Sequence, residues 1–164
     1  LNAAVAMRAY FFLGLYEAAA AMAVFFHVLS AGGWSYGMDL QSDDLLYRQA
    51  TTACLSAIVL LQIVNVFLCR SALRSVLTTG IGGNRLILYG VALEVALILL
   101  IDYTPLGNEL LGTAPIPLDA WLFLLPWAAG MLLLEEMRKY CARRRLAQTD
   151  AAMEEAAPRL HTQR

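Results

Sequence analysis

The stretch Leu86–Tyr103 reads LILYGVALEVALILLIDY and is apolar almost throughout. A helix rises about 1.5 Å per residue, so a helix over this run spans most of a hydrocarbon layer about 30 Å thick. Glu94 lies near the middle of the run, which places its carboxylate close to the bilayer midplane. A charge at that depth is costly when it faces lipid. Glu94 therefore predicts either a role in transport or a hydrogen bond to a neighbouring helix.

The composition of the whole chain agrees with a membrane location. Of its 164 residues 60% are hydrophobic and only 15% are charged, whereas soluble domains carry about 25% charged residues. This excludes an ordinary soluble domain and predicts an integral, multi-pass membrane protein. The three cysteines form no CxxC pair, so they indicate neither a disulfide framework nor a zinc site. The chain begins with Leu1 rather than Met, which predicts a fragment or a processed piece.

Four apolar runs of this kind follow one another along the chain. They cover Ala9–Leu29, Ala50–Leu68, Leu86–Ile101 and Leu118–Leu134. The last two are shorter than the roughly 20 residues that a crossing needs, so their flanks must complete it. We therefore expect an all-α membrane protein, a bundle of four transmembrane helices within residues 1–145. The polar segment 146–164 predicts a cytoplasmic tail that is partly disordered.

The charged residues are segregated between the two sides of the predicted bundle. Eleven of the 12 lysine and arginine residues lie before the first run, between the second and third, or after the fourth. The opposite side has Arg48 as its single base and holds six acids: Asp39, Asp43, Asp44, Asp102, Glu109 and Asp119. Cytoplasmic loops carry the excess of basic residues. This asymmetry predicts that both termini lie in the cytoplasm.

Four polar side chains within the apolar runs are candidates for an ion path: Glu17, Gln62, Asn65 and Glu94. Gln62 and Asn65 are three residues apart and share a helix face. Their amides can join helices or offer carbonyl oxygens to a cation. Counted from the cytoplasmic ends of their runs, all four fall within a slab of roughly 8 Å. Because each would cost free energy against lipid, we expect them to converge.

Further features of the runs predict packing rather than chemistry. Gly14, Ala18 and Ala21 form a small-residue face, on which Glu17 also lies, and such faces let helices approach closely. His27 lies near the outer end of its run and is expected at the membrane interface. Pro126 removes one backbone donor and should kink the fourth helix.

The order of motifs resembles helices seven to ten, the last four membrane helices, of type II P-type cation-transporting ATPases. The motifs are AYFFLGLYEA (9–18), YRQATT (47–52) with QIVNVFLCRS (62–71), NRLILYGVALE (84–94) with DYTP (102–105), and LPW (125–127) with LLLEEMRKYCARR (132–144). Together they cover nearly the whole chain; only the tail after Arg145 falls outside the resemblance.

The resemblance implies roles for some of the candidate residues. In that family, ions bind mainly among helices four, five, six and eight, and helices seven to ten form a largely static support. Gln62 and Asn65 match helix-eight positions where calcium and sodium pumps place a site residue, one of them a carboxylate. Here both are amides, which argues against a second high-charge site. Glu94 matches a helix-nine glutamate that sodium pumps associate with their additional sodium site, and Glu17 matches no family site role.

The motifs that the chain lacks limit its activity. It contains no Asp-Lys-Thr-Gly-Thr phosphorylation motif, no Thr-Gly-Glu-Ser loop and no helix-four Pro-Glu-Gly-Leu. We therefore expect no catalytic residue in this chain, no cofactor of its own and no ATP hydrolysis, whereas a parent pump would use ATP and Mg²⁺. The metal ligands are unknown, and the transported ion, with calcium or sodium favoured, stays open.

The expected partners are the lipid bilayer, helices one to six of the parent pump and the transported cation, with no nucleic acid. The expected location is a bacterial plasma membrane. The alternative is a stand-alone four-helix carrier or assembly protein derived from a pump. A haem enzyme would need paired ligands, and His27 has no second histidine within the runs.

Overall fold

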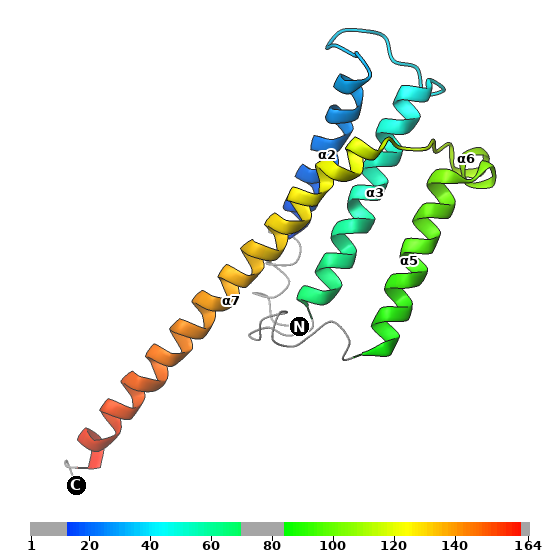
Figure 1. The fold of residues 1–164 in the computed structure, drawn as a ribbon. Coiled ribbons are helices and arrows are strands. Elements are labelled where there is room, and N and C mark those ends of the chain that lie inside the picture. The colour runs from blue at the N-terminus through cyan, green and yellow to red at the C-terminus, as the bar shows by residue number, and fades with distance from the viewer. Residues whose placement is uncertain (1–12, 70–83, 162–164) are drawn as a thin grey trace.

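The computed structural model describes residues 13–69 and 84–161. In this part of the chain all regular structure is helical. The helices are α2 (Gly14–Ala31), α3 (Leu45–Leu68), α5 (Arg85–Tyr103), the short α6 (Pro105–Leu111) and α7 (Leu118–His161). Figure 1 shows α2, α3 and α5 running side by side, with α7 crossing obliquely beside α2 and α3.

Within the described residues, four helices are long and apolar enough to cross a membrane: α2, α3, α5 and the part of α7 from Leu118 to Thr149. This confirms the four predicted spans. Their bounds differ from the prediction, because α3 already begins at Leu45 and α7 continues well past Leu134. Residues 9–12 of the first predicted span lie outside the described part.

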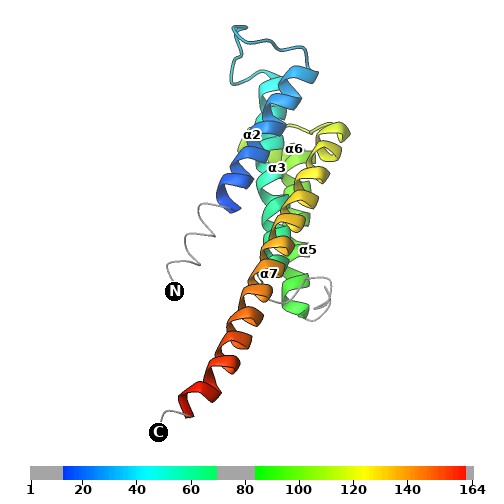
Figure 2. The ribbon, with the colours of Figure 1, turned by 90° about the vertical axis from the view of Figure 1, so that its left-hand side faces the viewer.

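The bundle has two chemically different ends. At one end lie α6 and the connections 32–44 and 112–117; we call this the α6 end. At the other lie the start of α5 at Arg85 and the basic residues of α7 from Arg138 to Arg145; we call this the basic end. α7 passes beyond the other described helices at the basic end (Figure 2), and its 44 residues correspond to about 66 Å.

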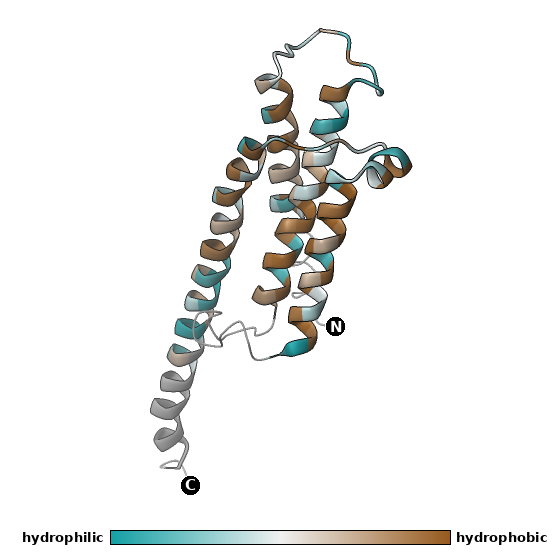
Figure 3. Ribbon diagram, turned by 45° about the vertical axis from the view of Figure 1, so that its right-hand side comes forward, coloured by the Kyte–Doolittle hydropathy of each residue, from teal (hydrophilic) through white to brown (hydrophobic). Residues whose placement is uncertain are grey.

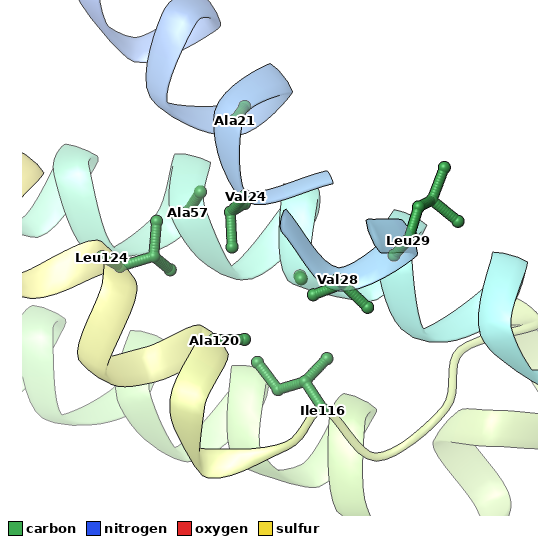
Figure 4. Packing of buried hydrophobic residues seen from close by; sticks show 10 residues of the cluster. Ala21, Val24, Val28, Leu29, Ala57, Ile116, Ala120 and Leu124 are labelled. Atoms are coloured by element: carbon green, nitrogen blue, oxygen red, sulfur yellow. The ribbon is translucent and has the colours of Figure 1, made fainter. Parts of the chain in front are cut away.

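The core lies where α2, α3 and α7 meet. Its buried members are mostly small or β-branched and come from all three helices and from the segment before α7: Ala21, Val24, Val28, Leu29, Ala50, Ala53, Ala57, Ile116, Ala120 and Leu124. Figure 4 shows α2 side chains packing between those of α3 and α7. The alanines let the helix backbones approach closely, as membrane helices require when lipid competes for apolar surface.

The small-residue face of the first span differs from its prediction. Ala21 is buried as expected, but Ala18 is exposed and Gly14 is half-buried. The face that contacts α3 is instead centred on Ala20 and Ala21 with Val24. Close packing over small residues is therefore present, but on a face rotated about the helix axis, because several neighbouring positions of α2 are alanine and could serve equally well.

α5 is the outlying helix of the bundle. Of its 19 residues only Ile98 and Asp102 are buried. Most of the other residues along this helix are hydrophobic (Figure 3), and many of them are exposed in this chain. An apolar cavity of about 250 Å³ separates it from α3 and the start of α7; Ile63, Leu99 and Trp121 are among its lining residues. α5 thus contacts α3 mainly towards the α6 end.

α7 continues as one helix through Pro126. The kink expected at this proline stays a prediction. The same helix includes residues 146–161, which the sequence predicted to be part of a separate tail, so the backbone there is helical in this structure. The division of the chain after residue 145 also stays a prediction.

Candidate functional site

Two of the four predicted ion-path residues meet between α2 and α3. The Gln62 amide Nε2 donates to Glu17 Oε2 over 3.4 Å. Glu17 lies in the first turn of α2 and is half-buried, and its other oxygen, Oε1, is buried and accepts no hydrogen bond from the described residues. A carboxylate oxygen and an amide carbonyl are ligands that hard cations accept. Glu17 therefore has one oxygen atom, Oε1, that the described part of the bundle does not use.

Asn65 lies one turn beyond Gln62 towards the basic end. Its side-chain oxygen accepts the Cys69 thiol at 3.2 Å within α3. Asn65 is half-buried, whereas Gln62 is exposed in this chain. The two amides share a face of α3 as predicted, but only Gln62 reaches α2.

Glu94 stays apart from this group. It lies in the middle of α5 and is half-buried. Among the described residues, no hydrogen bond or ion pair joins it to Glu17, Gln62 or Asn65. The expected convergence of all four side chains is therefore seen only for Glu17 and Gln62. The physical reason is the spacing of the helices, because the apolar cavity separates α5 from the inner half of α3.

A polar clasp joins α3 to the segment after α5 at the α6 end. The Arg48 guanidinium donates to three backbone carbonyls: Asn108 at 2.8 Å, Gly112 at 3.0 Å and Thr113 at 2.6 Å. Gly112 has φ 66°, a left-handed conformation that glycine adopts without strain, and it ends α6 there. The planar fork of an arginine can serve several acceptors at once. Arg48 therefore fixes the path of the chain between α6 and α7.

Thr52 and Ser56 extend the clasp along the same face of α3. Thr52 Oγ1 accepts the backbone N–H of Ala114 at 3.0 Å. Ser56 Oγ lies 2.7 Å from Asp102 Oδ2 on α5. Asp102 is fully buried. The sequence predicted it to be one of the acids of the outer side; the structure places it in the last turn of α5, at the α6 end, buried between two helices.

A second contact closes the bundle at the basic end. Lys139 of α7 is fully buried, and its ammonium group donates to the Leu68 carbonyl at 3.0 Å, at the end of α3. Its Nζ also lies 3.8 Å from Glu136. On the neighbouring face of α7, Arg138 makes two hydrogen bonds to Glu135, at 2.7 and 2.8 Å. A cation at a helix C-terminus stabilises its unsatisfied carbonyls.

His27 lies near the C-terminal end of α2, as the sequence predicts, and this end of α2 is at the α6 end of the bundle. Its ring stacks on Phe123 with centroids 4.3 Å apart. Nε2 lies 3.3 Å from Asp119 Oδ2, and this buried nitrogen forms no hydrogen bond with the residues described here. Within the described residues, no group of three or more His, Cys, Asp or Glu side chains is placed to hold a metal ion.

Sequence reasoning missed the residues of the clasp and the buried lysine. A signal for the clasp was present: Arg48, Thr52 and Ser56 follow one another at four-residue spacing, which places them on one face of a helix. Lys139 gave no comparable signal, because it is one of several bases expected at a cytoplasmic boundary.

Comparison with known proteins gives the family. Residues 1–141 match the family described as "Cation transporting ATPase, C-terminus". The chain belongs to this family. It is 28% identical over 119 residues to "Endoplasmic reticulum calcium ATPase srcA" of Aspergillus fumigatus, a match that covers 73% of the chain and 12% of that protein.

Two further relatives show the breadth of the family. The chain is 28% identical over 107 residues to "Probable cation-transporting ATPase F" of Mycobacterium tuberculosis, covering 65% of the chain and 12% of the relative. It is 24% identical over 168 residues to "Potassium-transporting ATPase alpha chain 1" of Xenopus laevis, a match that covers 88% of the chain and 16% of that relative. The chain thus spans only a small part of the length of these relatives, and the four membrane-long helices are those of the C-terminal region of cation-transporting ATPases.

Proposed function

We propose that this chain is the C-terminal membrane-support module of a cation-pumping P-type ATPase for calcium or sodium, and that it is not catalytic alone. The contact between Glu17 and Gln62 carries the proposal, because it places a carboxylate and an amide at one level of two packed membrane helices. One oxygen of Glu17 is buried and accepts no hydrogen bond within the described part of the chain. A buried polar atom without a partner is costly, so this oxygen suits a ligand or a further helix.

The chain by itself offers too few ligands for a dehydrated cation. Calcium takes six to eight oxygen ligands, and here Glu17, Gln62 and Asn65 contribute only a few. The remaining ligands would come from helices one to six of the parent pump, which we propose pack beside α2 and α3. Glu94 would stand on the α5 side of the same path.

The choice of ion follows from the charge of the site. Two amides in α3 weaken the case for two calcium sites but allow one, and sodium suits a site with a single carboxylate and neutral oxygens. The A. fumigatus relative is named for calcium and the X. laevis relative for potassium. The parent pump would use ATP and Mg²⁺, neither of which this chain is proposed to bind.

The proposed setting is a bacterial plasma membrane, with both termini in the cytoplasm. The mycobacterial relative supports a bacterial source, and the basic end of the bundle supports the orientation. In this setting the α6 end faces the outside of the cell.

The test uses the full-length pump and measures ATPase activity against cation concentration. Gln62→Ala should raise the half-maximal cation concentration about tenfold, which corresponds to about 1.4 kcal/mol for one lost oxygen ligand. Glu94→Gln should shift the apparent affinity or its pH dependence. Gln148→Ala, an exposed glutamine of α7, is the matched control and should leave the curve unchanged.

Phosphorylation by ATP should survive in all three variants, since the acceptor aspartate lies elsewhere in the pump. Unchanged cation affinity in Gln62→Ala and in a Glu17→Gln variant would show that the pair only joins α2 to α3. A change in Gln62→Ala but none in Glu94→Gln would place α5 outside the ion path.

A further inference from the structure

The hydroxyl of Ser56 has more acceptors within reach than it has hydrogens. Its Oγ lies 3.0 Å from the Thr52 carbonyl oxygen and 2.7 Å from Asp102 Oδ2. A serine hydroxyl has one hydrogen to donate and can accept two. The Thr52 carbonyl can only accept. Both contacts are full hydrogen bonds when Asp102 Oδ2 donates a hydrogen to Ser56 and Ser56 donates its own to Thr52.

The described surroundings of Asp102 provide neither a paired base nor a hydrogen-bond donor for its second oxygen, Oδ1. The side chain is fully buried, and its second oxygen, Oδ1, accepts no hydrogen bond from the residues that the structure describes. In the described part of the chain, no base lies within ion-pair distance of it. Burying a charge is costly unless it is paired and hydrogen-bonded. The number of hydrogens at Ser56 and the burial of Asp102 thus both favour a neutral carboxylic acid.

The charged groups of the neighbouring elements do not alter this conclusion. On α3, Arg48 directs its donors to three backbone carbonyls. On α6, Glu109 is exposed, and on α7, Asp119 is exposed and lies beside His27. On α5 itself, Glu94 is eight residues away, about 12 Å along the helix.

We propose that Asp102 is a proton-binding site in the contact between α3 and α5, where it is held as a neutral carboxylic acid. When the proton leaves for water at the α6 end, Asp102 gains one negative charge, and the Ser56 hydrogen turns from the Thr52 carbonyl to the carboxylate. The charged group then requires hydration, which the closed contact does not provide.

Release of the proton therefore loosens the attachment of α5. Ile98 and Asp102 are the two buried residues of this helix, and the apolar cavity separates much of the rest from α3. The position of α5 would thus respond to proton concentration at the α6 end. This inference is independent of the proposed ion path, because it uses neither Glu17 nor Gln62.

Infrared spectroscopy of the full-length protein in membranes tests the proposal. At neutral pH we expect a carboxylic-acid C=O band that shifts when the aspartate carboxyl carbons are labelled with ¹³C. The band should disappear in Asp102→Asn. In Ser56→Ala it should persist at higher frequency, because the acid loses its hydrogen-bond acceptor. Asp119→Asn, at an exposed aspartate, is the control and should leave the band in place.

Absence of any label-sensitive acid band would overturn the proposal, since Asp102 would then be ionised and would accept the serine hydrogen. A band that stays unchanged in both Asp102→Asn and Ser56→Ala would overturn it as well, because the acid would be another aspartate. If Asp102→Asn does not fold, labelling of the parent protein and of Ser56→Ala decides the question without it.

Discussion

At the scale of single residues, two of the fully buried side chains with ionisable groups, Asp102 and Lys139, have different surroundings. Asp102 has one hydrogen-bond partner and a second oxygen without one, whereas Lys139 reaches a helix C-terminus, where its charge is favourable. The same degree of burial therefore comes with different hydrogen-bond partners: a serine hydroxyl for Asp102 and a helix-end carbonyl for Lys139.

Lys139→Met gives a residue-scale prediction. The methionine keeps the apolar stem but leaves the Leu68 carbonyl without its donor, so the protein should lose about 1–3 kcal/mol of stability. Its thermal unfolding midpoint in detergent should fall accordingly. Arg145→Met, at an exposed base of the same helix, should change the midpoint little. Equal midpoints in the two variants would show that the contact to α3 contributes nothing.

At the scale of helices, the contact between α2 and α7 depends on one glycine. The Tyr16 hydroxyl donates to the Trp127 carbonyl at 2.7 Å, and the two rings meet edge to face with centroids 5.5 Å apart. A Cβ at Gly130 would collide with that hydroxyl. Glycine at this position therefore makes room for the tyrosine rather than for a bend in α7, whose helix continues on both sides.

Gly130→Ala is the corresponding prediction at the helix scale. The added methyl group must displace the tyrosine, which should cost about 1–3 kcal/mol as other overpacked sites do. In a Tyr16→Phe background the same substitution should cost less, because the clashing hydroxyl is gone. Thermal unfolding of the two single variants and the double variant measures this coupling.

The matched control is Gly90→Ala in α5. A Cβ at Gly90 would point into open space, so alanine there should be neutral or stabilising by about 0.5–1 kcal/mol through its better helix propensity. If Gly130→Ala behaves like Gly90→Ala, the tyrosine can move at no cost and the contact does not restrain α7.

At the scale of the whole molecule, a buried or multiply bonded cation lies at each end of the bundle, and apolar packing dominates the region between them. The clasp around Arg48 closes the α6 end and Lys139 closes the basic end. Between them, alanine and valine side chains hold α2, α3 and α7 together. This arrangement suits a support whose helices keep their mutual positions, with α5 as the less firmly held member.

The orientation of this bundle gives a whole-molecule prediction. Tyr36 is 99% exposed in the connection between α2 and α3, and Cys69 and Cys141 are exposed at the basic end. If both termini are cytoplasmic, a membrane-impermeant thiol reagent should label Tyr36→Cys in intact cells. The parent protein should be labelled only after permeabilisation. Labelling of the parent in intact cells would reverse the proposed orientation.

The sequence by itself determined the order of the four membrane-long helices in the described part of the chain, and the family to which they belong. Each membrane crossing requires about 20 apolar residues whatever its neighbours are, so a span can be recognised from its own residues. The sequence also predicted that α2 packs through small residues and that Gln62 and Asn65 share a helix face. Both predictions depend only on the spacing of residues along one helix.

Only the tertiary structure decided which faces meet and which polar groups come together. A helix that is apolar on all sides has no polar stripe that would show which face is buried. The sequence therefore could not show that Ala20, and not Ala18, is buried in the bundle. The distance between helices is likewise absent from the pattern within one helix. The distances between the helices decide that Gln62 contacts Glu17 and that Asp102 is buried against Ser56. They also decide that Glu94 lies apart from these residues, on a helix with an apolar cavity between it and α3. Packing across helices, which couples residues 45 positions apart or more in the chain, sets these contacts.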